Sequence, residues 1–182
     1  ATLNNYKEVL FGAPEKNRQS DFFLWVWNSI SVVAVTSVIS VILAAISAYA
    51  FSRFKFPGRA AGLVFLLTTQ MIPAGMLLLP LFIMIAKLKM INTSLGLIIA
   101  YAVTSVPLTI WTLKGYYDTI PVDLEEAALI DGASRLTVFT KIILPLSTPA
   151  LAIAFLFSFM GGWSEYLFFF NDTATTEIYT WP

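Results

Sequence analysis

The sequence contains no cysteine and no histidine, and charged residues make up only 12% of it. Without these two residues there is no disulfide, no Cys/His metal site, no thiolate nucleophile and no imidazole base, so most familiar catalytic arrangements are excluded. The formal net charge is zero, and no basic stretch is interleaved with aromatic residues. Nothing therefore indicates nucleic-acid binding. We expect no resident metal, no cofactor and no nucleic-acid partner.

The scarcity of charge accompanies a hydrophobic content of 58%. Four runs carry no charged residue at all, at 22–52, 60–86, 90–113 and 142–164. Each is longer than the roughly 20 residues that cross a hydrocarbon core of about 30 Å as a helix. A soluble bundle would need polar faces that these runs do not supply. The sequence predicts an all-α, polytopic transmembrane helix bundle with four spans, near 24–51, 61–86, 95–113 and 148–168.

The segments around the first two spans fit this interpretation. Residues 1–23 combine charged side chains with glycine and proline, which is typical of a loop that enters the membrane from one side. The second span contains Pro73 and Pro80, which tend to kink a helix. The chain begins at Ala1 rather than Met, and no cleavable signal sequence is visible. We therefore expect upstream sequence, including a further span, to precede it.

The long polar loop 114–146 contains a short predicted helix at 121–132. Pro121 suits a first helical turn, acidic residues complement the positive end of the helix dipole, and Gly132 suits the helix exit. One face of this helix would be narrow, with acidic groups beside it, and consists of Leu124, Ala127, Ala128 and Asp131. Such a surface is shaped for insertion into a groove.

A second amphipathic segment follows the short helix. It runs from residue 134 to residue 143, with Leu136, Phe139 and Ile143 at helical spacing. We expect these three side chains to form one apolar stripe that braces the first helix against the membrane.

The loop also carries a spaced motif, made of Glu126-Ala127-Ala128, Gly132, Ile142 and Leu144-Pro145. At every position it matches the cytoplasmic signature of the permease subunits of ABC importers, which is Glu-Ala-Ala, three residues, Gly, nine residues, Ile, one residue, Leu-Pro. The chain resembles this family over roughly residues 1–168. Residues 49–59 and the segment Asp131-Gly132-Ala133 are similar to the carbohydrate-importing, maltose-permease-like branch.

This resemblance implies the type-1 permease fold, truncated, over residues 24–168, with about four spans and a cytoplasmic coupling helix within the coupling loop 114–146. Lys and Arg are divided almost evenly between the two sides of the membrane, so their distribution alone does not orient the spans. With the coupling loop in the cytoplasm, residues 1–23 become an extracytoplasmic loop. The implied location is a bacterial or archaeal cytoplasmic membrane.

The implied function is transport. The chain would be the transmembrane subunit of an ATP-driven importer, moving a sugar or sugar-like solute by alternating access. Its implied partners are an ABC ATPase subunit, a second permease subunit, an extracytoplasmic solute-binding protein and membrane lipid. No Gly-x-x-x-x-Gly-Lys-Ser/Thr loop occurs, so we expect no catalytic residue here and ATP hydrolysis by a separate partner. The implied ATPase-coupling interface is Glu126, Ala127, Ala128, Asp131, Gly132, Ile142, Leu144 and Pro145.

Polar and aromatic side chains within the spans are candidates for a substrate pathway, namely Thr69, Gln70, Tyr101 and Thr104. Taken singly, each is better explained by hydrogen bonding between helices. Residues 169–182 shift abruptly toward threonine and acidic residues and resemble no permease. We expect them to be a non-native tail of the kind translated from a sequencing adapter, standing where the family has a final span.

Two other classes of function remain open. A membrane-embedded enzyme could use the loop carboxylates Asp123, Glu125, Glu126 and Asp131 as acids or as magnesium ligands, although no phosphate cradle accompanies them. A structural membrane scaffold would not need the complete motif. Within the permease interpretation the solute could also be a non-sugar, because branches of the family carry glycerol phosphates and other polyols. Pairing with a second copy or with a sister permease is equally open.

Overall fold

The computed structural model describes residues 22–91 and 93–164, and every regular element within these ranges is a helix. The predicted loop before residue 22 and the predicted tail 169–182 lie outside the described residues. The helices, in order, are α2 (Phe22–Arg53), α3 (Arg59–Gln70), α4 (Ala74–Lys87), α5 (Ser94–Thr119), α6 (Asp123–Ile130), α7 (Arg135–Val138), the π-helical turn η2 (Phe139–Ile143), α8 (Leu144–Leu146) and α9 (Thr148–Ser164).

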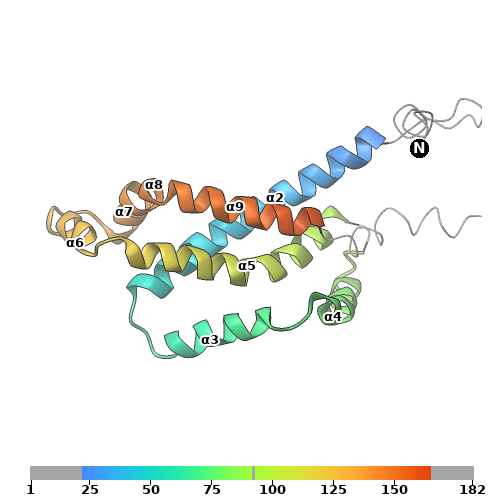
Figure 1. The fold of residues 1–182 in the computed structure, drawn as a ribbon, viewed down its shortest axis with the longest axis horizontal. Coiled ribbons are helices and arrows are strands. Elements are labelled where there is room, and N and C mark those ends of the chain that lie inside the picture. The colour runs from blue at the N-terminus through green and yellow to red at the C-terminus, as the bar shows by residue number, and fades with distance from the viewer. Residues whose placement is uncertain (1–21, 92, 165–182) are drawn as a thin grey trace, which may run out of the picture.

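Three long helices form the centre of the molecule. Helices α5 and α9 lie side by side, and α2 crosses behind them and packs against both (Figure 1). Helix α3 runs along α5 on the other side, while α6, α7 and α8 gather at one end of the bundle. The loop that carries the spaced motif is therefore placed at the end of the bundle, away from its middle.

Small side chains line the buried face of α2. They let the neighbouring helices approach closely, as in other lipid-embedded bundles, and comprise Ser37, Ser40, Ala44, Ala45 and Ala48. Long apolar side chains on the same helix point outward instead, among them Trp27, which is 70% exposed, and Ile46. An apolar exterior of this extent is costly in water and is the kind of surface that a bilayer would cover.

Two of the four predicted spans are single helices. Helices α2 and α5 are each long and apolar enough to cross a membrane. The second predicted span, 61–86, is not one kinked helix: α3 and α4 meet at 96°. The break lies at Pro73, which lacks an N–H and disfavours helical geometry at Ile72, whereas Pro80 is accommodated inside α4. Helices α3 and α4 form one span only if the two together cross the membrane. The same condition holds for the second bent pair of helices, at 135–146 and 148–164.

The ends of the other two spans also differ from prediction. Helix α5 continues to Thr119 instead of ending near residue 113, because Lys114 does not stop it. Its Nζ pairs with Oδ2 of Asp118 one turn later, at 2.5 Å, an arrangement that supports a helix. Helix α9 ends the described residues at Ser164 and meets the α7–α8 segment at 75°. The predicted stretch 165–168 lies outside the described residues.

The start of α5 depends on the absence of a side chain at Gly96. A Cβ there would lie 2.4 Å from the backbone oxygen of Met90, whereas a Cβ at Gly115 in the same helix meets nothing within 4 Å. Alanine is ordinarily worth up to about 1 kcal/mol over glycine inside a helix. We predict that Gly115→Ala leaves thermal stability in detergent equal or raised. Gly96→Ala should lower stability by roughly 1–3 kcal/mol, because backbone must move; equal melting temperatures would contradict this packing.

Candidate functional site

The predicted short helix in the coupling loop is present as α6. Its first turn is closed by the carbonyl of Val122, which accepts from the backbone N–H groups of Glu125 and Glu126 at 2.9 and 3.0 Å. Pro121 therefore precedes the first turn instead of occupying it. Ile120 is extended, with ψ of 124°, as the residue before a proline usually is.

The exit of α6 is a left-handed cap at Gly132, whose φ is +86°. The backbone N–H of Gly132 donates to the carbonyl of Leu129 at 3.1 Å, and that of Ala133 donates to the carbonyl of Ala128 at 3.0 Å. This pair of bonds is the Schellman motif, which satisfies the last helical carbonyls. The glycine of the spaced motif thus sets the direction in which the chain leaves α6.

Substitution at Gly132 tests this cap separately from packing, because a Cβ there would meet nothing within 4 Å. We predict that Gly132→Val lowers the free energy of unfolding by roughly 1–2 kcal/mol, since left-handed backbone strains a β-branched residue. Gly132→Asn should lose less, because asparagine tolerates this conformation. Thermal unfolding of both variants in detergent checks the order. Identical losses would mean that backbone strain is not the cause.

The residues of the spaced motif differ in exposure. Glu126 and Ala127 are exposed, as are Asp131, Gly132 and Pro145, and Ala128 is half-buried. Ile142 and Leu144 are half-buried and pack against the main apolar core. The first part of the motif therefore presents a surface, and the second part ties the loop to the bundle.

The predicted apolar stripe in the second segment is wrong at one of its three positions. Phe139 and Ile143 are buried, but Leu136 is 71% exposed and Val138 is buried in its place. Ser134 caps α7, accepting from the N–H of Thr137, and the chain then passes into the π-helical turn η2. A π turn holds more residues than an α turn, so it changes the register between the two halves of the stripe.

Glu125 behaves differently from its neighbour Glu126. It is only 3% exposed and points back at the bundle, where its Oε1 pairs with Nε of Arg53. The hydroxyl of Tyr49 donates to its Oε2 at 2.9 Å. Arg53 also donates from Nη2 to the carbonyl of Ile120 at 2.8 Å. Glu125 thus joins α6 to the end of α2, a role that the sequence analysis did not assign to it.

Aromatic rings enclose this ion pair. The ring of Tyr49 lies 4.8 Å from that of Phe139 and 6.5 Å from that of Tyr117, measured between centroids. Phe54 approaches Tyr49 edge-on and carries the guanidinium of Arg135 over its face at 5.5 Å. The charges of Arg53 and Glu125 are therefore held away from water among apolar groups, where their mutual pairing matters most.

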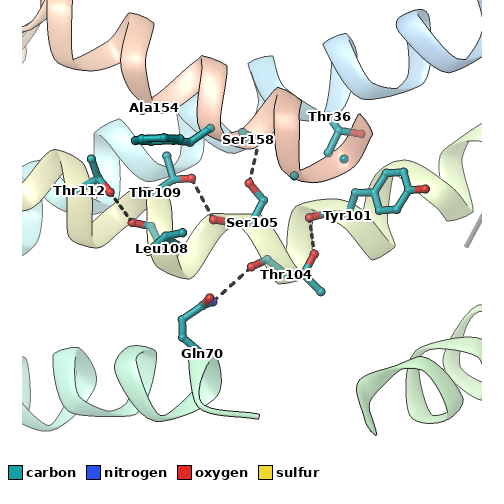
Figure 2. Close-up of a pocket in the computed structure, with 13 residues that line it drawn as sticks. Thr36, Gln70, Tyr101, Thr104, Ser105, Leu108, Thr109, Thr112, Ala154 and Ser158 are labelled. Carbon is teal, nitrogen blue, oxygen red and sulfur yellow. Dashed lines mark hydrogen bonds between the residues drawn. The ribbon is translucent and has the colours of Figure 1, made fainter. Parts of the chain in front are cut away.

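A second feature lies in the middle of the bundle. It is a cavity of about 240 Å³ between α2, α5 and α9 and the end of α3 (Figure 2). Three of the four predicted substrate-pathway residues line it, namely Gln70, Tyr101 and Thr104. Thr69 does not line it, and its hydroxyl donates to the carbonyl of Leu66 at 2.7 Å. Ser105, Thr109 and Ser158 also line the cavity.

Most hydroxyl groups that line this cavity already donate a hydrogen bond to another group of the protein. Thr104 donates to the carbonyl of Tyr101 at 3.0 Å and Thr109 to that of Ser105 at 2.9 Å, each within its own helix (Figure 2). Ser105 and Ser158 share one hydrogen bond of 2.7 Å across α5 and α9. Among the residues that the structure describes, all those that line the cavity are uncharged. The wall therefore offers mainly hydroxyl and amide oxygens as acceptors.

Comparison with known proteins identifies the family of this chain. Residues 17–171 match the family described as the binding-protein-dependent transport system inner membrane component. The chain belongs to this family. It is a membrane-embedded component, and its helical fold agrees with that of a solved structure described as a bacterial ABC transporter involved in the import of the acidic polysaccharide alginate. That likeness has a TM-score of 0.66 at 28% identity, covering 81% of this chain and 56% of the other.

Curated relatives of this chain are named as sugar transport proteins. It is 38% identical over 181 residues to the galactooligosaccharides transport system permease protein GanQ of Bacillus subtilis (strain 168), covering 100% of this chain and 62% of that relative. It is 42% identical over 143 residues to the maltose/maltodextrin transport system permease protein MalG of Vibrio vulnificus (strain YJ016), covering 75% and 48%. The chain thus spans about half to three fifths of the length of these relatives.

Proposed function

We propose that this chain is the transmembrane subunit of an ATP-driven importer that moves a sugar across the cytoplasmic membrane by alternating access, with ATP hydrolysed by a separate subunit. One observation carries the proposal: the first part of the spaced motif, Glu126-Ala127-Ala128, lies on a largely exposed helix, α6, at the end of a bundle of apolar helices (Figure 1). Relatives named as sugar transport permeases support the solute class. A second permease subunit and an extracytoplasmic solute-binding protein complete the proposed assembly.

The surface of α6 fits an ATPase cleft in its chemistry. Glu126 and Ala127 are exposed on it, and Leu124 and Ile130 add apolar area, at 47% and 86% exposure. Small residues allow backbone to approach backbone, the apolar side chains need cover, and an acidic group needs a basic partner. We propose that α6 docks through this face and that Asp131, Gly132 and Pro145 lie at its margin.

The alternative of a membrane-embedded enzyme receives less support from the geometry. One of its four carboxylates, Glu125, is taken up by Arg53 and Tyr49. Within the residues that the structure describes, no group of three His, Cys, Asp or Glu side chains could hold a metal ion. Of the loop carboxylates, Glu125 thus belongs to a buried ion pair with Arg53, and the other three are exposed.

We further propose that the cavity of Gln70, Tyr101 and Thr104 belongs to the solute pathway and favours a neutral, polyhydroxylated solute. Sugar hydroxyl groups can donate to the acceptor oxygens of its wall. A phosphate or carboxylate brings only acceptors and a charge, and none of the described residues that line the cavity is a cation that could compensate for its desolvation. Phe157, which also lines it, offers an apolar face for a sugar ring.

Because the chain contains no cysteine, an introduced thiol can report on this cavity. In the assembled transporter, a neutral oligosaccharide should slow the methanethiosulfonate modification of Ser158→Cys at least threefold, and glucuronate should not. The matched control is Thr119→Cys, which is exposed at the loop end of α5 and does not line the cavity. Its modification should be unaffected by either solute. Equal protection of Ser158→Cys by both solutes would contradict the preference for neutral solutes.

A further inference from the structure

The end of α2 and the coupling helix α6 are joined by one buried polar cluster, the Arg53–Glu125 link, made of Arg53, Glu125, the hydroxyl of Tyr49 and the carbonyl of Ile120. The side chains of Arg53 and Glu125 are 8% and 4% exposed. Three chain segments meet here, because Tyr49 and Arg53 belong to the last turns of α2, Ile120 is the C-cap residue of α5 and Glu125 lies in the first turn of α6.

The charges of this link complement the helix ends that they join. Arg53 is the last residue of α2, and its guanidinium also donates to the carbonyl of Ile120, the C-cap residue of α5, so one positive charge lies at the negative ends of two helices. Glu125 places its negative charge in the first turn of α6, at that helix's positive end. Each charge is thus stabilised by helix dipoles as well as by its partner.

The Arg53–Glu125 link lies beside closely packed side chains of the main apolar core. The aromatic rings of Tyr49, Tyr117 and Phe139 pack against one another beside it, and a close-packed contact transmits displacement instead of absorbing it. Ser52 adds a second tie between α2 and α5, donating to Oδ1 of Asp118 at 2.6 Å. A force applied to α6 must therefore move the end of α2 or break the buried pair.

Helix α2 leads from this link to the cavity. Thr36, which lines the cavity, lies 17 residues before Arg53 on the same helix, a distance of about 25 Å along the axis. Helix α2 also packs along both α5 and α9. A displacement of its end is thus delivered to the helices that enclose the cavity.

We propose that Arg53 and Glu125 are positioning residues for energy coupling: their buried pair is the rigid connection through which α6 moves α2. This inference rests on the proposed function, since it requires an ATPase that pulls on α6. It assigns to the two adjacent glutamates separate tasks. Glu126 contacts the partner, and Glu125 carries the resulting motion into the membrane.

The test is the ratio of solute imported to ATP hydrolysed, measured in proteoliposomes that contain the full-length gene product with its ATPase, sister permease and binding protein. This ratio is unaffected by the fraction of protein that is folded, because misfolded transporters drop out of both quantities. We expect Glu125→Gln to retain the ATPase in pull-down, to continue hydrolysis and to lower the ratio at least fivefold. Glu126→Gln should instead reduce the ATPase retained, with little change in the ratio.

A milder pair of variants covers the case in which Glu125→Gln does not assemble. Tyr49→Phe removes only the hydroxyl that donates to Glu125, and we expect it to lower the ratio about twofold. Tyr117→Phe makes the same chemical change in the same aromatic cluster, but the buried Tyr117 hydroxyl has no hydrogen-bond partner among the described residues. It should leave the ratio unchanged.

The possible outcomes distinguish a failure of the proposed function from a failure of the positioning role. If the unaltered transporter neither hydrolyses ATP nor imports sugar, the proposed function fails. If it couples normally and the ratio stays unchanged in Glu125→Gln, or in Tyr49→Phe where the former does not assemble, the positioning role is wrong while the proposed function stands. An equal fall in Tyr49→Phe and Tyr117→Phe would show that the aromatic cluster, and not the link, sets the ratio.

Discussion

Glu126→Lys is expected to lower the amount of ATPase retained by the assembled permease at least tenfold and to remove solute-stimulated ATP hydrolysis. Glu126 is exposed on α6, so its replacement does not disturb the core of the bundle. At a packed interface the new charge would face the basic group that the glutamate meets in the proposed complex. Repulsion and desolvation there can reach several kcal/mol, and about 1.4 kcal/mol already corresponds to a factor of ten.

Pull-down of the ATPase, together with hydrolysis in vesicles, measures both parts of this result. The control is Lys141→Glu, a charge reversal at an exposed position of the neighbouring turn η2 that lies outside the proposed interface. It should keep the ATPase. Insertion of the spans should be normal in both variants. Unchanged retention and stimulation in Glu126→Lys would show that α6 is not the coupling element.

Arg53→Leu is expected to lower the free energy of unfolding by about 3–5 kcal/mol, because it leaves the carboxylate of Glu125 buried without its cation. The loss also removes the donor to the carbonyl of Ile120. In the double variant Arg53→Leu/Glu125→Leu no unpaired charge remains, and most of the stability should return. Thermal unfolding of the single and double variants in detergent gives the comparison.

The size of the recovery decides what the pair contributes. Recovery in the double variant means that the cost of the single change is an uncompensated charge. If the single and double variants unfold at the same temperature, Glu125 is not confined as the structure describes, and the carboxylate reaches water when Arg53 is absent. Surface ion pairs give differences of only about 0–1 kcal/mol, so a large effect is itself evidence of burial.

Hydrophobic patterning predicted the all-helical fold and the positions of α2 and α5, because a span must satisfy its backbone internally and requires a long uncharged run. It was less reliable at helix ends. The predicted span ends at residue 113, before Lys114, but a charge that finds a partner one turn away, here Asp118, can continue a helix. The sequence does not distinguish Pro73 from Pro80, yet the helix is interrupted only at Pro73, and Pro80 lies inside α4. Local context decides which proline ends a helix.

The candidate site was predicted in part. The spaced motif located α6 and its glycine exit, since positive φ leaves few choices of residue. The opposite orientations of Glu125 and Glu126 could not be predicted, because adjacent helical residues differ by about 100° and either one could face the bundle. The partner that selects Glu125 is Arg53, which lies 72 residues away in the sequence. The π-helical turn that exposes Leu136 has no comparable sequence signal.

Uptake by the reconstituted importer tests the central claim most directly. The full-length gene product is combined in proteoliposomes with its ATPase, sister permease and binding protein, and the entry of a labelled neutral oligosaccharide is followed with ATP and with a non-hydrolysable analogue. We predict accumulation against a gradient that requires ATP, the ATPase and an intact Glu126. Accumulation that proceeds equally without ATP or the ATPase would contradict the account.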